Sequence, residues 1–142
     1  MQGNNSRLDE LQAAFLAAKL PHLEKMNDER RRIAEKYLNG IKNPEVILPY
    51  VPDYATPVWH IFGIRCSRRA ELETYLNAAG IGTNKHYPIP MHLQDCYKDL
   101  GYKKGDFLIA EEISATELSI PMYYGMSEEE IQYVIETINQ FK

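Results

Sequence analysis

The stretch VWHIFGIRC, residues 58–66, decides the fold class together with the residues that follow it to Tyr87. Its aromatic and β-branched side chains predict a strand. Ser67 then has the side chain of a helix N-cap, and Gly80 is suited to close the helix. Residues 81–87 predict a second, short strand. Since the interval is long enough for a crossover helix, the pattern indicates an α/β fold with a small mixed sheet.

Towards the N-terminus, the pattern predicts a long kinked helix. Apolar residues recur at helical spacing over residues 7–20 and again up to Gly40. Pro21 interrupts the pattern, because proline lacks the N–H and its ring clashes with the preceding turn. Four prolines then make residues 41–57 a connector, in which Val46 and Ile47 could form a short edge strand.

Towards the C-terminus, the sequence alternates loops with short elements. Residues 88–105 are loop-rich with a short helix near 94–100, and residues 107–117 predict a helix before a strand at 118–120. The last helix begins with the capping box of Ser127 and Glu130 and carries one apolar stripe. We therefore expect residues 1–142 to form one α/β domain, in which helices flank the sheet.

Composition narrows the function classes. The 142 residues carry a net charge of −4, which argues against a nucleic-acid surface. No apolar stretch is long enough to span a membrane, and the N-terminus lacks the apolar core of a signal peptide, so we expect a cytoplasmic protein. Cys66 and Cys96 show neither a disulfide framework nor metal-ligand spacing, and we expect reduced thiols and no metal site.

The run from Asn5 to Ala14 is a chemically dense helix start. Ser6 and Asp9 fit a capping box, and a helix N-terminus offers unpaired N–H groups and a partial positive charge. Asn5 and Arg7 add side-chain donors at the same end. The residues alone leave two interpretations open: an ordinary capped helix with a solvated arginine, or an anion site suited to phosphate.

A second dense block is GIGTNKHYPIPMHLQ, residues 80–94. His86 and Tyr87 stand at the end of the expected strand, before a loop stiffened by two prolines, so their side chains can be presented in a fixed direction. The amide, imidazole and phenol groups of the block can bond hydroxyls and a diphosphate. His92 is either part of such a site or a surface-loop histidine.

Four segments resemble the nucleotide-sugar aminotransferases of the DegT/DnrJ/EryC1/StrS type, which are fold-type I, pyridoxal-phosphate-dependent enzymes. Residues 3–14 resemble the family's G-x-N-x-R-L-x-E-x-Q-A-A run, and residues 80–94 resemble G-I-x-T-x-x-H-Y-P-x-P-x-H-x-Q. Residues 58–62 resemble V-W-H-x-F, and residues 110–121 resemble A-E-x-x-S-x-x-x-L-S-L-P. The matches follow the family's order and span nearly the whole chain. The proline-rich block is most similar to the branch that aminates keto-sugars on thymidine diphosphate, particularly at C-3.

The resemblance implies a fold and site residues. The chain would be the small C-terminal domain, and its long helix would link it to a large cofactor domain and carry an exposed apolar face. Asn5 and Arg7 would contact the phosphate of pyridoxal 5'-phosphate, whereas His86, Tyr87 and His92 would bind the nucleotide-sugar. We expect His60 to be a hydrogen-bonded structural residue of a core strand and Glu111 to be an ion-pair or capping partner.

The resemblance also implies what this chain lacks. Transamination requires a Schiff-base lysine and an acidic partner for the pyridine nitrogen, which in the family precede the segment that opens this chain. Lys19, Lys25 and Lys85 do not stand in the family's lysine motif. We therefore expect no catalytic residue here and an inactive fragment.

The full enzyme would be a homodimer in deoxyamino-sugar biosynthesis, such as that of lipopolysaccharide O-antigen, with glutamate as amino donor. The alternative is a non-catalytic dimerisation or regulatory module derived from this domain.

Overall fold

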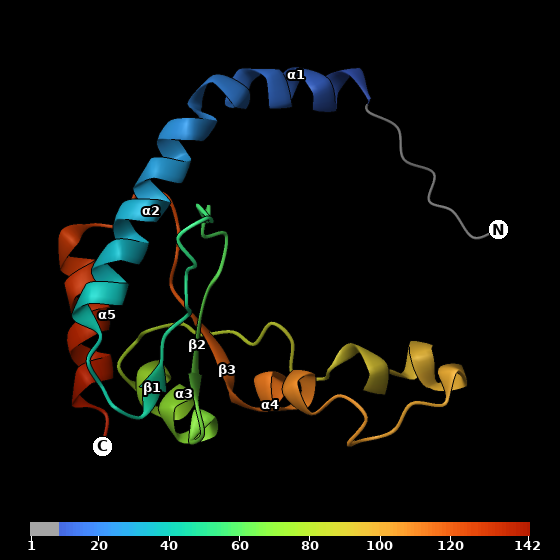
Figure 1. The fold of residues 1–142 in the computed structure, drawn as a ribbon. Coiled ribbons are helices and arrows are strands. Elements are labelled where there is room, and N and C mark those ends of the chain that lie inside the picture. Colours follow the sequence, from blue (N-terminus) through green and yellow to red (C-terminus); the bar gives the residue numbers. More distant parts are fainter. Residues whose placement is uncertain (1–8) are drawn as a thin grey trace.

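A computed structural model describes residues 9–142, which form helices around a small antiparallel sheet (Figure 1). Within these residues the sheet has three strands in the order β1 (Val46–Ile47), β2 (Phe62–Cys66) and β3 (Glu117–Ile120). β2 is central, and its register places Phe62 opposite Ile120. The α/β class and the edge strand at residues 46–47 are confirmed.

The two faces of the sheet differ in chemistry because side chains alternate along each strand. Phe62, Ile64 and Cys66 of β2 are buried on one face. This face packs with apolar side chains of three helices, among them Tyr37, Leu72 and Ile138. The other face of β2 and β3 carries small or polar residues, namely Gly63, Arg65, Glu117 and Ser119. The core therefore lies on one side of the sheet, and the other side carries polar residues, of which Glu117 and Ser119 are buried.

The N-terminal helix is kinked, as predicted. It consists of α1 (Glu10–Lys19), the 3-10 turn η1 (Leu20–His22) and α2 (Leu23–Gly40), and Pro21 lies in the turn. Figure 1 shows α1 and the first part of α2 extending beyond the rest of the domain. The predicted exposed apolar surface is confirmed on this part, where large apolar side chains are about half or more exposed to solvent: Leu11, Phe15, Leu16, Leu20 and Leu23.

The remaining helices are α3 (Arg69–Ala78), η2 (Met91–Leu93), η3 (Asp95–Leu100), α4 (Leu108–Thr116) and α5 (Glu128–Gln140). The capping box of α5 is confirmed, since the Glu130 N–H donates to Ser127 Oγ over 3.2 Å and the Ser127 N–H donates to Glu130 Oε2 over 2.8 Å. The predicted Ser67 cap of α3 is wrong. Its N-cap residue is Arg68, whose side chain pairs with Glu45 and Glu71.

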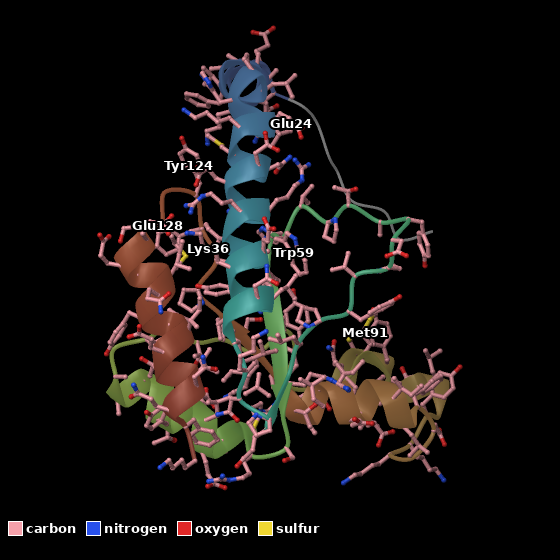
Figure 2. All side chains as sticks on the ribbon, turned by 60° about the vertical axis from the view of Figure 1, so that its left-hand side comes forward. Glu24, Lys36, Trp59, Met91, Tyr124 and Glu128 are labelled. Atoms are coloured by element: carbon pink, nitrogen blue, oxygen red, sulfur yellow. The ribbon has the colours of Figure 1, made fainter. Side chains whose placement is uncertain are left out.

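Helices α2 and α5 lie side by side over the apolar face of the sheet (Figures 1 and 2). Figure 2 shows Lys36 of α2 beside Glu128, the first residue of α5. Lys36 and Arg32 both form ion pairs with Glu128. These pairs lower the pKa of the Glu128 carboxyl, with the hydrogen bond from Lys36 as the largest cause. The contact joins the N-terminal helix to the C-terminal one.

One strand prediction was wrong, and another was confirmed over a shorter range. Residues 81–87 form a single antiparallel bridge, between Asn84 and Ser119, so the sheet is antiparallel and not mixed. The segment has no apolar alternation after Ile81 to hold a longer strand against a core. The strand predicted at residues 58–66 is β2, which begins only at Phe62. Trp59 adopts a left-handed φ of 49°, and this breaks the extended backbone before the strand.

The predicted Ser6 cap lies outside the described residues, within which α1 begins at Glu10 with Asp9 as its N-cap residue, later than the predicted start near Arg7. In residues 9–142, no helix combines the length and the apolar character that a membrane crossing needs.

Candidate functional site

The polar face of the sheet and the segment after α3 together place His86 in a hydrogen-bonded network. The His86 Nδ1 atom lies 2.8 Å from Ser119 Oγ, and Nε2 lies 3.3 Å from Asn84 Nδ2. The backbone N–H of His86 donates to Glu117 Oε2 over 2.7 Å. The bridge between Asn84 and Ser119 holds the segment against β3. The imidazole is therefore held at both ring nitrogens and at its own backbone.

Glu117 and Ser119 form the buried base of this network. They are 8% and 6% exposed, and Ser119 Oγ donates to Glu117 Oε1 over 2.5 Å. Gly63 of β2 lies opposite Ser119 in the register. A Cβ added at Gly63 would come within 3.0 Å of Glu117 Oε1. Glycine in the middle of this strand thus leaves the space that the carboxylate occupies.

A cavity of about 300 Å³ opens beside the network. Its polar lining comes from His60, Thr83, Asn84, His86 and Ser119, and Ile61, Ile120 and Met122 contribute apolar walls. Hydroxyl, amide and imidazole groups can each donate or accept hydrogen bonds. The cavity can therefore bind a small ligand rich in hydroxyl groups.

Arg30 of α2 fixes one wall of this cavity. Its Nη1 donates to the carbonyl oxygens of Trp59 over 3.2 Å and Met122 over 3.0 Å. Figure 2 shows Trp59 beside α2. His60 lies in this wall, exposed and outside β2, so the prediction of a core-strand histidine is wrong. The left-handed backbone at Trp59 turns the chain before the strand begins.

His86 and Tyr87 are adjacent, and their ring centroids are 5.5 Å apart. Tyr87 is 68% exposed and does not line the cavity. Its binding role stays a prediction. Asn5 and Arg7, the predicted cofactor contacts, lie outside the described residues. The structure thus places His86 in a formed site and leaves Tyr87 at its margin.

His92 lies in a different part of the domain. Its side chain is 8% exposed, and Nε2 lies 3.0 Å from Glu111 Oε1. Its ring packs against Phe107, with centroids 4.8 Å apart. Glu111 also accepts from the Gly105 N–H over 2.8 Å, and this bond is the largest cause of a lowered Glu111 pKa. The capping role of Glu111 is confirmed, since its Oε1 also accepts the N–H of Phe107, the N-cap residue of α4, while substrate binding by His92 stays a prediction.

Sequence reasoning missed Glu117 and Ser119 as site residues. Their signal is a polar residue at every second position of an otherwise apolar strand, which places both on one face. We predicted Glu117 as the end of the preceding helix, which is wrong because it begins β3, and we assigned Ser119 no role. Within residues 9–142, no group of three or more His, Cys, Asp or Glu side chains is arranged to hold a metal ion.

The comparisons with known proteins identify the family. Residues 1–139 match the model of the DegT/DnrJ/EryC1/StrS aminotransferase family. This chain belongs to that family. The family prediction made from four ordered segments is therefore confirmed.

The chain is similar to curated sugar transaminases. It is 44% identical over 140 residues to the dTDP-3-amino-3,6-dideoxy-alpha-D-galactopyranose transaminase of Aneurinibacillus thermoaerophilus, covering 99% of this chain and 38% of that protein. It is 41% identical over 142 residues to a pleiotropic regulatory protein of Geobacillus stearothermophilus, covering 98% of this chain and 38% of that protein. The chain thus spans under two fifths of the length of these relatives.

A solved relative shares the fold. The crystal structure of S. venezuelae DesV in complex with a ketimine intermediate has a TM-score of 0.92 and 38% sequence identity. The match covers 99% of this chain and 38% of the DesV chain. The expected likeness to part of an aminotransferase is confirmed by this match.

Proposed function

We propose that this chain is the C-terminal domain of a pyridoxal-phosphate-dependent aminotransferase that converts a nucleotide-linked keto-sugar into an amino-sugar. The observation that carries the proposal is the formed His86 cavity in a chain that belongs to this family along nearly all its length. The relatives named as transaminases of dTDP-linked sugars support this substrate class.

In this proposal the cavity binds the sugar part of the substrate. Its described lining holds hydroxyl, amide and imidazole groups and neither lysine nor arginine, which suits sugar hydroxyls better than phosphate. His86 orients a sugar hydroxyl, with Asn84 and Ser119 beside it. Tyr87 and His92 are proposed as further contacts to the nucleotide-sugar.

Asn5 and Arg7, which precede Asp9, the N-cap residue of α1, in the sequence, are proposed to bind the cofactor phosphate through their side-chain donors. Pyridoxal 5'-phosphate, when bound, supplies the electron sink for amino transfer. The lysine next to the cavity residues does not suggest an activated amine, because Lys85 Nζ pairs with Glu73 Oε1 over 2.8 Å. We propose that residues 1–142 alone do not transaminate.

We propose glutamate as amino donor, a homodimer as the working assembly, a cytoplasmic location and a role in supplying amino-sugars for glycans such as lipopolysaccharide O-antigen. The family membership supports an aminotransferase role. The exposed apolar side chains of α1 and η1 support contact with further protein surface, because large exposed patches mark interaction sites.

The test is the full-length gene product incubated with pyridoxal 5'-phosphate, glutamate and a thymidine-diphosphate 3-keto-sugar. We expect the absorbance of bound cofactor and an amino-sugar nucleotide in the mass spectrum. Residues 1–142 alone serve as the control and should give no product. A full-length protein that neither retains the cofactor nor forms the amino-sugar would contradict the proposal.

The second candidate is a non-catalytic dimerisation or regulatory module. Its specific support is the 41% identity to a relative named a pleiotropic regulatory protein and the exposed apolar helix. A full-length protein that dimerises but does not retain the cofactor in the same experiment would favour this module.

A further inference from the structure

We propose that Glu117 is a positioning residue that acts through Ser119 to fix the tautomer of His86, so that Nε2 faces the cavity as a hydrogen-bond acceptor. The proposal deepens the sugar-binding role of this site and rests on it for the identity of the ligand. The protonation pattern itself follows from the hydrogen bonds within the chain.

The first step is the direction of the bond between Ser119 and Glu117. An ionised carboxylate has only acceptor atoms. Glu117 Oε2 accepts the backbone N–H of His86 over 2.7 Å, and Oε1 lies 2.5 Å from Ser119 Oγ. Ser119 must therefore donate its hydroxyl proton to Glu117. Arg65, the register partner of Glu117 in β2, pairs with Glu112 over 3.2 Å.

The second step follows at His86. Because the proton of Ser119 is used on Glu117, Ser119 Oγ accepts from His86 Nδ1 over 2.8 Å. A neutral imidazole with its proton on Nδ1 has a free electron pair on Nε2. The chain of bonds from the buried carboxylate thus selects one of the two tautomers.

Asn84 gives independent support from the opposite side of the ring. Its Oδ1 accepts the backbone N–H of Lys85 over 2.8 Å, which turns its NH₂ group towards His86. Asn84 Nδ2 lies 3.3 Å from His86 Nε2, and an NH₂ group can only donate. Nε2 is therefore an acceptor by this argument as well.

The consequence is selectivity for a ligand group that donates. The bond from Asn84 is long at 3.3 Å, so a ligand hydroxyl can share or replace it at Nε2. A sugar hydroxyl has a proton to donate, whereas an ionised phosphate oxygen has none. His86 is thereby directed to a hydroxyl of the sugar. Burial of the Glu117 carboxyl costs free energy, which an apolar residue at this position would avoid. A role in positioning His86 accounts for the presence of a glutamate here.

The decisive variant is Glu117→Gln. Its amide oxygen must stay on the His86 N–H, so its NH₂ group turns to Ser119, which then accepts. Ser119 in turn donates to His86 Nδ1, and the ring proton moves to Nε2, which gives up the long 3.3 Å bond from Asn84. Glu136→Gln is the matched control, because Glu136 is exposed on α5, where it accepts from Gln132 and makes no contact with the network. It should leave the tautomer of His86 unchanged.

The readout is the ¹⁵N chemical shifts of the His86 ring, measured on the 142-residue chain, which carries its own buried core. Wild type should show a protonated Nδ1 and an unprotonated Nε2, and Glu117→Gln should show the reverse. Should Glu117→Gln fail to fold, Ser119→Ala should give a mixture of tautomers. A protonated Nε2 in wild type, or an unchanged pattern in the folded Glu117→Gln variant, overturns the proposal.

Kinetics of the full-length protein separate this proposal from the proposed function. Glu117→Gln should raise the KM for the nucleotide-sugar about tenfold, as for one lost hydrogen bond at a buried site, and leave the KM for the amino donor unchanged. If the tautomer reverses and neither KM changes, the positioning role of Glu117 stands, and sugar binding at His86 is contradicted.

Discussion

Gly63 shows how one missing side chain makes room for the site. Its position opposite Ser119 in the centre of the sheet is where a β-branched residue would normally be favoured. The carboxylate of Glu117 occupies the space that a Cβ would need. Gly63 has no functional side chain, but its small size allows the position of Glu117, which accepts the backbone N–H of His86.

We predict that Gly63→Ala disturbs the His86 network. The added Cβ would lie 3.0 Å from Glu117 Oε1, so the carboxylate must shift, and stability should fall by about 1–3 kcal/mol as in other overpacked sites. Urea unfolding measures the loss. Gly82→Ala is the control, since its Cβ would meet no described atom within 4 Å. Equal stability of the two variants would contradict the crowding argument.

The sequence pointed to His86, but not to the residues that hold it. His86 stands in a dense polar block, which local reasoning can detect. Ser119 and Glu117 lie some thirty residues further along, and their contact with His86 depends on how the chain packs. Nothing in the local pattern distinguishes a serine in an apolar strand from a tolerated core residue. The network became visible only with the tertiary structure.

At the scale of elements, the predicted features that depend on local chemistry were confirmed. Proline at position 21 kinks the helix, and the serine–glutamate pair caps α5. The prediction of a strand at residues 81–87 was wrong. Strand pairing depends on residues distant in the sequence and on which edge of the sheet is unpaired, and the local pattern reports neither. In the structure, this segment pairs with β3 only through the bridge between Asn84 and Ser119. Other residues of the segment, including Thr83 and His86, line the cavity.

The α5 capping box predicts a measurable contribution to stability. Ser127→Ala removes the acceptor for the Glu130 N–H and should cost about 1 kcal/mol in the free energy of unfolding. Ser67→Ala is the matched control, because Ser67 is exposed and Arg68 is the N-cap of α3; its effect should stay within about 0.5 kcal/mol. Equal losses for the two variants would show that the α5 cap is not specific.

The contacts that join α4 to η2 and to the loop after η3 should lose stability in acid, because they depend on the carboxylate of Glu111. The pKa of Glu111 is lowered in the folded state, first by the N–H of Gly105 and then by His92, from the 4.5 of an unperturbed glutamate. Its stabilising effect is therefore full above that value and is lost as the pH falls through the folded pKa.

Glu111→Gln should make the decline of stability between about pH 5 and pH 2 shallower. The check is the free energy of urea unfolding measured against pH for both proteins. A residual slope is expected from other carboxyls with lowered pKa values, namely Glu71, Glu128 and Glu129. A variant whose stability falls as steeply as wild type would show that Glu111 is not responsible.

For the whole molecule, the arrangement separates the core from the proposed binding regions. The core lies on one face of the sheet, and Ser119, on the other face, lines the His86 cavity. The helix that carries the exposed apolar side chains of α1 and η1 extends beyond the rest of the molecule (Figure 1). The N-terminal helix thus joins the packed domain to the segment that carries Asn5 and Arg7.

In the full-length protein, Asn5→Ala should weaken retention of pyridoxal 5'-phosphate, because it removes a donor to the phosphate. The measurement is the cofactor absorbance that remains after dialysis. Asn4→Ala, one position earlier, is the control and should retain the cofactor like wild type. Equal retention by Asn5→Ala and wild type would count against the predicted phosphate contact.

The most direct test of the central claim, that this domain binds the sugar nucleotide through His86, is the steady-state kinetics of His86→Ala in the full-length protein. The KM for the nucleotide-sugar should rise, by about tenfold or more for a lost buried hydrogen bond, while the KM for the amino donor stays at the wild-type value. Equal changes in the two KM values, or no change in either, would contradict the account.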